Sequence, residues 1–60
     1  MRNSIRNSIR NIRARRAKLA LARAELAYAI TEYPADSADV SFARWMVAHH
    51  KGRLPVWARF

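Results

Sequence analysis

Residues 5–33 read IRNSIRNIRARRAKLALARAELAYAITEY, and this stretch decides the fold. Large apolar residues and two arginines recur in it at alternating spacings of four and three, the heptad pattern of a helix with one continuous contact face. The pattern predicts a single helix over about residues 4–33 whose contact face needs a partner that accepts arginine. We call this face the seam, and its nine positions are Ile5, Ile9, Ile12, Arg16, Leu19, Arg23, Leu26, Ile30 and Tyr33.

A second, shorter helix is predicted after Pro34, which ends the first helix because proline lacks an N–H and restricts the preceding residue. Asp36 or Ser37 can cap the second helix, which is expected over about residues 37–51 and ends at Gly52. The fold class is therefore all-α, a helical hairpin followed by an extended aromatic tail. The expected buried face of the second helix is Phe42, Trp45, Met46 and His49.

The aromatic residues are the largest apolar side chains in this sequence that could form a core. We expect them to be buried, and the alternative is that they stack on nucleic-acid bases. The tail, residues 53–60, is expected to fold back over the hairpin or to dock on a partner. Leu21 and Tyr28 lie off the seam, which indicates that the first helix is buried on two faces. The aromatic residues expected in the core are Tyr33, Phe42, Trp45, Trp57 and Phe60.

The chain is small and lacks the usual covalent reinforcements. It has 60 residues and no cysteine, so disulfides are excluded, and its two histidines are adjacent, which excludes a four-ligand zinc site within one chain. Stability must come from packing, from a partner or from a homo-oligomer. No nucleophile lies in a motif with a base, so we expect no enzymatic activity, no metal and no cofactor. The longest uncharged run near the seam, residues 26–31, is too short for a transmembrane segment.

Positive charge is concentrated at the N-terminus. The net charge is +8, and residues 1–16 contain six arginines and no acidic residue. We therefore divide one small domain into a basic arm, residues 1–16, and a hairpin, residues 17–60. A second helix of about 15 residues covers only about half of a first helix of about 29. It is expected on residues 19–33, which leaves the basic arm uncovered.

A local motif suggests what the basic arm binds. The cluster Arg10, Arg13, Arg15, Arg16 and Lys18, followed by an apolar stretch that reaches Arg23, resembles the arginine-rich RNA-binding helix of the lambdoid phage antiterminator N proteins. The resemblance covers about residues 10–23 and implies that the five basic residues contact phosphates and bases. The chain departs from this family in its isoleucine ridge and compact aromatic C-terminal part. The full set of predicted nucleic-acid-binding residues is Arg2, Arg6, Arg10, Arg13, Arg15, Arg16 and Lys18.

These features predict a small regulatory or accessory protein that binds nucleic acid, RNA rather than DNA, or a nucleoprotein machine. Its expected location is the cytoplasm, which is the host cytoplasm if a phage encodes it. One alternative is a protein-binding module or inhibitor whose seam inserts into a larger protein or self-associates. Another is an amphipathic helix on an anionic membrane surface. The predicted partner-binding residues are Ile5, Ile9, Ile12, Arg16, Leu19, Arg23, Trp57 and Phe60.

The two seam arginines, Arg16 and Arg23, have three interpretations at this stage. They can pair with Glu25 or Glu32 of an antiparallel copy, or meet acidic groups of a different protein. They can also extend their aliphatic stems along the seam while their charged heads stay in water. A parallel homodimer is disfavoured because it would stack arginine on arginine.

Overall fold

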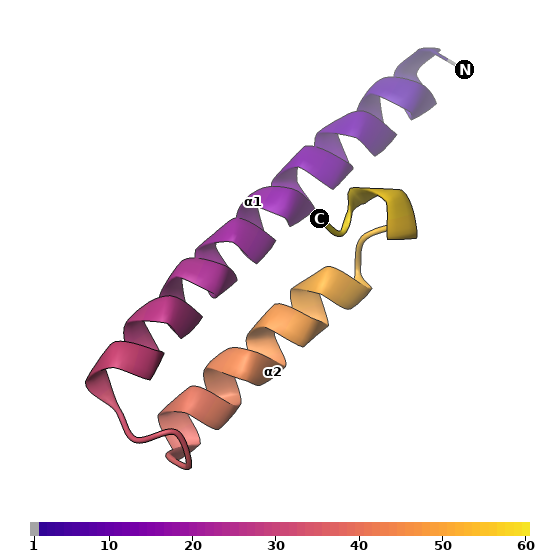
Figure 1. The fold of residues 1–60 in the computed structure, drawn as a ribbon. Coiled ribbons are helices and arrows are strands. Elements are labelled where there is room, and N and C mark those ends of the chain that lie inside the picture. The colour runs from indigo at the N-terminus through magenta and orange to yellow at the C-terminus, as the bar shows by residue number, and fades with distance from the viewer. Residues whose placement is uncertain (1) are drawn as a thin grey trace.

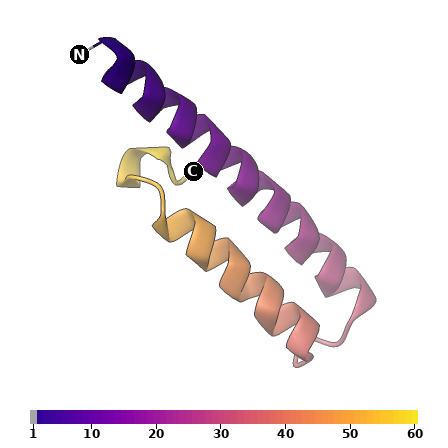
Figure 2. The same ribbon diagram turned by 180° about the vertical axis from the view of Figure 1, so that it is seen from behind.

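Two antiparallel helices of unequal length form the molecule (Figures 1 and 2). The computed structural model describes residues 2–60, with side chains from Ser8 onward. Helix α1 spans Arg2–Glu32, helix α2 spans Ala38–Gly52, and a short 3-10 turn, η1, spans Val56–Ala58. The rod measures 49 × 16 × 15 Å. The N-terminal end of α1 projects beyond α2 and the tail, so the predicted hairpin with a long first helix is confirmed (Figure 1).

The loop between the helices starts α2 with a side-chain cap. The backbone N–H of Val40 donates to the Ser37 hydroxyl oxygen at 3.2 Å, and Ser37 has the extended backbone of an N-cap residue. Asp39 lies in the first turn of α2, where the positive end of the helix dipole favours an acidic group. Of the two caps that the sequence offered, the structure uses Ser37.

The end of α2 does not depend on the special freedom of glycine. Gly52 has a negative φ, and the chain closes with bonds from the Arg53 N–H to the His50 carbonyl and from the Leu54 N–H to the Lys51 carbonyl, at 3.3 and 3.1 Å. A Cβ atom added at Gly52 would meet nothing within 4 Å. Gly52 is therefore the last residue of α2, but its backbone is one that other residues can also adopt.

Replacing Gly52 with alanine should stabilise the protein. Alanine fits the existing backbone and lowers the entropy of the unfolded chain, which is worth about 0.5–1 kcal/mol. Thermal unfolding followed by circular dichroism measures the change, and the melting temperature should rise. A lower melting temperature would show that the backbone at Gly52 differs from the one described.

The core is narrow and consists of small aliphatic side chains. One cluster joins Leu19 of α1 to Leu54 and Ala58 of the tail. A second joins Ala29 of α1 to Val40 and Ala43 of α2. Partly buried residues flank both clusters, and they are Ile12, Leu26 and Val47.

The contact face of α1 is rotated from the predicted seam by roughly 50°, about half of the angle between successive residues. Leu19 is buried as predicted. Ala22 and Ala29 are buried in place of the neighbouring seam positions Arg23 and Ile30, which are exposed. Burying a guanidinium costs desolvation energy, whereas an alanine carries no such cost and lets two helices approach closely. The prediction that the seam positions Arg23 and Ile30 lie at the contact with the second helix is therefore wrong.

The predicted aromatic core is also wrong. Val40 and Ala43 face α1, and this rotation of α2 turns its rings outward. Small side chains on both helices leave little space between them for an indole ring. The exposed fractions of the aromatic side chains are Tyr33 43%, Phe42 63%, Trp45 57%, Trp57 68% and Phe60 74%.

The tail folds back along α1, but it is not simply extended. After Pro55 it forms η1, in which the Ala58 N–H donates to the Pro55 carbonyl at 2.9 Å. Leu54 and Ala58 are 2% and 1% exposed and lie against Leu19. The buried contacts between the tail and the hairpin are therefore made by Leu54 and Ala58, not by the side chains of Trp57 and Phe60.

Candidate nucleic-acid interface

Exposed basic side chains continue along α1 from Lys18, which lies beside α2, toward the part of the helix that α2 does not cover. Arg10, Arg13, Arg16 and Lys18 are exposed to solvent, and Arg15 is half-buried. They belong to one helix, so their backbone spacing is fixed at 1.5 Å of rise per residue. The predicted contacts Arg2, Arg6 and Ile5 have side chains outside the described part of the chain.

The tail covers part of the segment that the sequence assigned to the basic arm. Ile12 packs against the cluster formed by Leu19, Leu54 and Ala58. The Nη1 atom of Arg15 donates to the Arg53 carbonyl at 3.1 Å. The tail therefore reaches further along α1 than α2 does, and the fully uncovered part of α1 ends before Ile12.

The two seam arginines bind the tail of their own chain. Arg23 donates from Nη1 to the Phe60 main-chain oxygen at 3.2 Å and from Nη2 to the Arg59 main-chain oxygen at 3.1 Å. The Arg16 guanidinium carbon lies 4.3 Å from the centre of the Phe60 ring, a cation–π contact. None of the three interpretations from the sequence described this arrangement. A phenyl ring carries no formal charge, so this contact does not neutralise the Arg16 guanidinium.

Replacing Arg23 with methionine should loosen the tail without unfolding the hairpin. The variant keeps an unbranched aliphatic stem but loses the two hydrogen bonds to the tail. Because the site is exposed, this loss is worth about 1 kcal/mol, so the Ala58 amide should exchange with solvent about fivefold faster. Hydrogen exchange followed by NMR measures this rate. Arg44→Met on α2 is the control, and equal acceleration in both variants would contradict the role of Arg23.

The predicted partner-binding residues have different environments in the structure. Ile9 is 48% exposed, and Trp57 and Phe60 are also exposed, so these three are accessible to a partner. Leu19 is 2% exposed and belongs to the core. Its predicted partner contact is therefore corrected, because the tail and α2 already occupy its surface.

A row of rings on the outer side of α2 was not predicted to be exposed. The Phe42 and Trp45 rings lie 6.1 Å apart with a 22° angle between their planes, and Trp45 and His49 lie 5.0 Å apart at 12°. His49 meets His50 edge to face at 5.2 Å. The helical spacing of these residues was visible in the sequence, but it does not tell which side of α2 faces α1.

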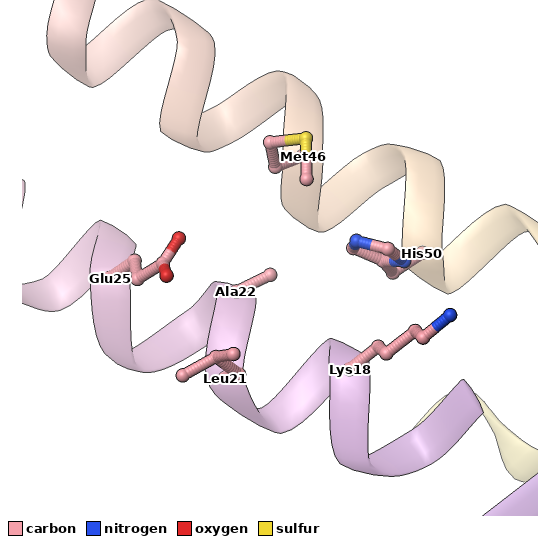
Figure 3. A pocket seen from close by; sticks show the side chains of 6 residues that line it. All are labelled: Lys18, Leu21, Ala22, Glu25, Met46 and His50. Carbon is pink, nitrogen blue, oxygen red and sulfur yellow. The ribbon is translucent and has the colours of Figure 1, made fainter. Parts of the chain in front are cut away.

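An open pocket of about 280 Å³ lies between the two helices (Figure 3). The Lys18 and Glu25 side chains come from α1 and lie toward opposite ends of the pocket. His50 connects the pocket to the row of rings on α2 through its contact with His49. The complete lining is Lys18, Leu21, Ala22, Glu25, Met46 and His50.

Neither a metal cluster nor a membrane-spanning helix is present in residues 2–60. The described side chains include no group of three or more His, Cys, Asp or Glu residues that could hold a metal ion. Both long helices lack an apolar stretch sufficient to cross a membrane. In comparisons with known proteins, no family model matches the chain, and neither a curated protein nor a solved structure is significantly similar to it.

Proposed function

We propose that the protein is a small regulatory or accessory factor that binds nucleic acid through the exposed arginines at the N-terminal end of α1. The observation that supports this proposal is the exposure of Arg10 and Arg13, of which Arg10 lies beyond the reach of α2 and the tail and Arg13 lies at the edge of the part that the tail covers. Among the described arginines, those whose guanidinium groups donate hydrogen bonds to main-chain carbonyls are Arg15, Arg23 and Arg59. Arg10 and Arg13 thus present their guanidinium groups to solvent and to any ligand there.

Arginine on a single helix suits phosphate recognition. Its planar fork donates two parallel hydrogen bonds to a phosphate, and neutralising phosphates releases counterions, which supplies much of the affinity. The net charge of +8 favours association with a polyanion.

RNA is favoured over DNA. A lone helical end is slender enough to enter an RNA major groove that a bulge or loop has widened. The resemblance of residues 10–23 to the lambdoid antiterminator helix supports the same preference. The exposed Trp57 and the ring of Phe60 beside Arg16 add surfaces on which unpaired bases can stack. We place this activity in the cytoplasm, which is that of the host if a phage encodes the protein.

Recovery of bound material from cells tests the proposal. The full chain is purified at low salt, one half is treated with nuclease, and both halves are analysed for nucleic acid and by mass spectrometry for protein. We expect nucleic acid to accompany the chain and proteins held through it to be lost after nuclease treatment. Recovery of one specific protein that resists nuclease would overturn the proposal and favour the protein-binding alternative.

A further inference from the structure

Beside the pocket between the helices lies an apolar surface that the chain leaves uncovered. Leu21 and Tyr28 of α1 are 61% and 62% exposed, and their spacing of seven residues places them on one face of the helix. The pocket connects the two helices, since Leu21 lines it together with Met46 and His50, and His50 touches the row of rings. An exposed apolar helix face beside an open pocket marks a candidate interaction site on so small a chain.

We propose that this surface binds a second copy of the same chain in an antiparallel, two-fold symmetric dimer. In such a dimer the same patch is used by both copies, so it must be complementary to itself. The proposed interface consists of the pocket with its neighbouring apolar side chains and is separate from the predicted seam. It is also separate from the arginines to which the nucleic-acid proposal is assigned.

The charges around the pocket provide this self-complementarity. Lys18 and Glu25 lie about two helical turns apart on α1, on either side of Leu21 and Ala22. A two-fold axis that passes beside α1, perpendicular to it and at the level between Leu21 and Ala22, brings Lys18 of each copy opposite Glu25 of the other. Two ion pairs then flank a central contact between the two Leu21 side chains. The same rotation places Met46 of one copy near His50 of the other.

A second copy fits this surface better than a nucleic acid does. Glu25 would repel phosphates, and Lys18 and Glu25 together leave the lining of the pocket without the excess positive charge found at the N-terminus. An antiparallel arrangement also points the two basic N-terminal segments in opposite directions, which keeps their charges apart. A standard interface needs roughly 800 Å² from each partner. With the axis between residues 21 and 22, about residues 11–32 of α1 overlap, so a face 16 Å wide supplies roughly 500 Å² from each copy, which corresponds to a weak, reversible dimer.

Charge reversal tests the pairing of the two copies. Sedimentation equilibrium of the nuclease-treated protein should show a monomer–dimer equilibrium. Lys18→Glu and Glu25→Lys should each weaken dimerisation by about tenfold, because each places two like-charged pairs at the interface. The double variant should restore it, since the pairs re-form with exchanged positions. A parent protein that is monomeric at every concentration, or a double variant no better than the single ones, would overturn the proposal.

Disulfide trapping tests the position of the axis. The chain has no cysteine, so a single cysteine can pair only with its copy in another chain. Leu21→Cys lies beside the proposed axis and should form a covalent dimer under mild oxidation. Ala20→Cys is the matched control, because one residue along α1 turns the side chain by about 100° to another exposed face. Equal cross-linking of the two variants contradicts the proposed interface, whatever the result of the nucleic-acid experiment.

Discussion

Replacing Leu19 with alanine should leave most of the protein unfolded at room temperature. Leu19 is 2% exposed and holds together the cluster that joins α1 to Leu54 and Ala58. Truncating a buried leucine costs about 2–5 kcal/mol, because the surrounding structure closes the cavity only in part. A domain of this size rarely has more than about 3–5 kcal/mol of total stability. Far-UV circular dichroism and urea titration measure the loss.

Ile30→Ala is the matched control for the core substitution. Ile30 lies on the predicted seam with Leu19, but it is 54% exposed in the structure. Its truncation should change the unfolding free energy by about 0.5 kcal/mol or less. Equal losses in both variants would indicate that α2 packs on the seam predicted from the sequence, and the described rotation of α1 would then be incorrect.

Changing Arg6, Arg10 and Arg13 to glutamine should remove most of the affinity for nucleic acid. Helical spacing predicts that these three arginines share one face of α1, and Arg10 and Arg13 are exposed in the structure. Loss of three phosphate contacts should reduce the slope of log affinity against log salt concentration by about 2–3. Fluorescence anisotropy with a labelled RNA hairpin that carries a bulge, repeated across a salt series, measures both quantities. An unchanged slope would falsify the assignment of these arginines.

A charge-matched variant separates the arginine stripe from the overall charge. Arg44, Lys51 and Arg53 are exposed on α2 and just after it, and changing all three to glutamine removes the same formal charge. The Arg53 carbonyl that accepts from Arg15 remains in this variant. We expect affinity to fall modestly and the salt slope to change by less than about 1. Similar losses in the two triple variants would mean that net charge alone drives binding.

The boundaries of the helices could be predicted from the sequence because local chemistry sets them. Pro34 cannot continue a helix, and Ser37 has a side-chain oxygen at the right distance for a capping bond. The predicted ranges of about 4–33 and 37–51 lie close to Arg2–Glu32 and Ala38–Gly52. The uncovered N-terminal end of α1 follows from the same two lengths.

The rotation of each helix about its own axis could not be predicted in this way. The heptad spacing accommodates two faces of α1, one with Arg23 and Ile30 and one with Ala22 and Ala29, because both include Leu19. A count of large apolar residues favours the first face, and close packing with low desolvation cost favours the second. Which face of α1 forms the contact depends also on the side chains that α2 presents, so the sequence of α1 alone does not determine it.

In the candidate site, too, features of one helix could be predicted, whereas contacts between segments could not. Exposure of Arg10 and Arg13 follows from their position on the longer helix. The contacts of Arg16 and Arg23 with Phe60 and Arg59 depend on the path of the tail after Pro55, which periodicity does not determine. The order of the rings on α2 was visible, but their exposure required the rotation of α2.

Because alanines line the contact between the helices, substitutions at small residues should disturb the fold more than substitutions at the large aromatic residues. At Ala29 and Ala43, which pack together with Val40, one additional methyl group would overpack the contact between the helices, so these small side chains tolerate little variation. The large rings on the outside can change with little effect on folding and are therefore available for binding. Variants of this chain that still fold should therefore keep the buried alanines, whereas the exposed aromatic residues can be substituted in ways that change what the surface binds.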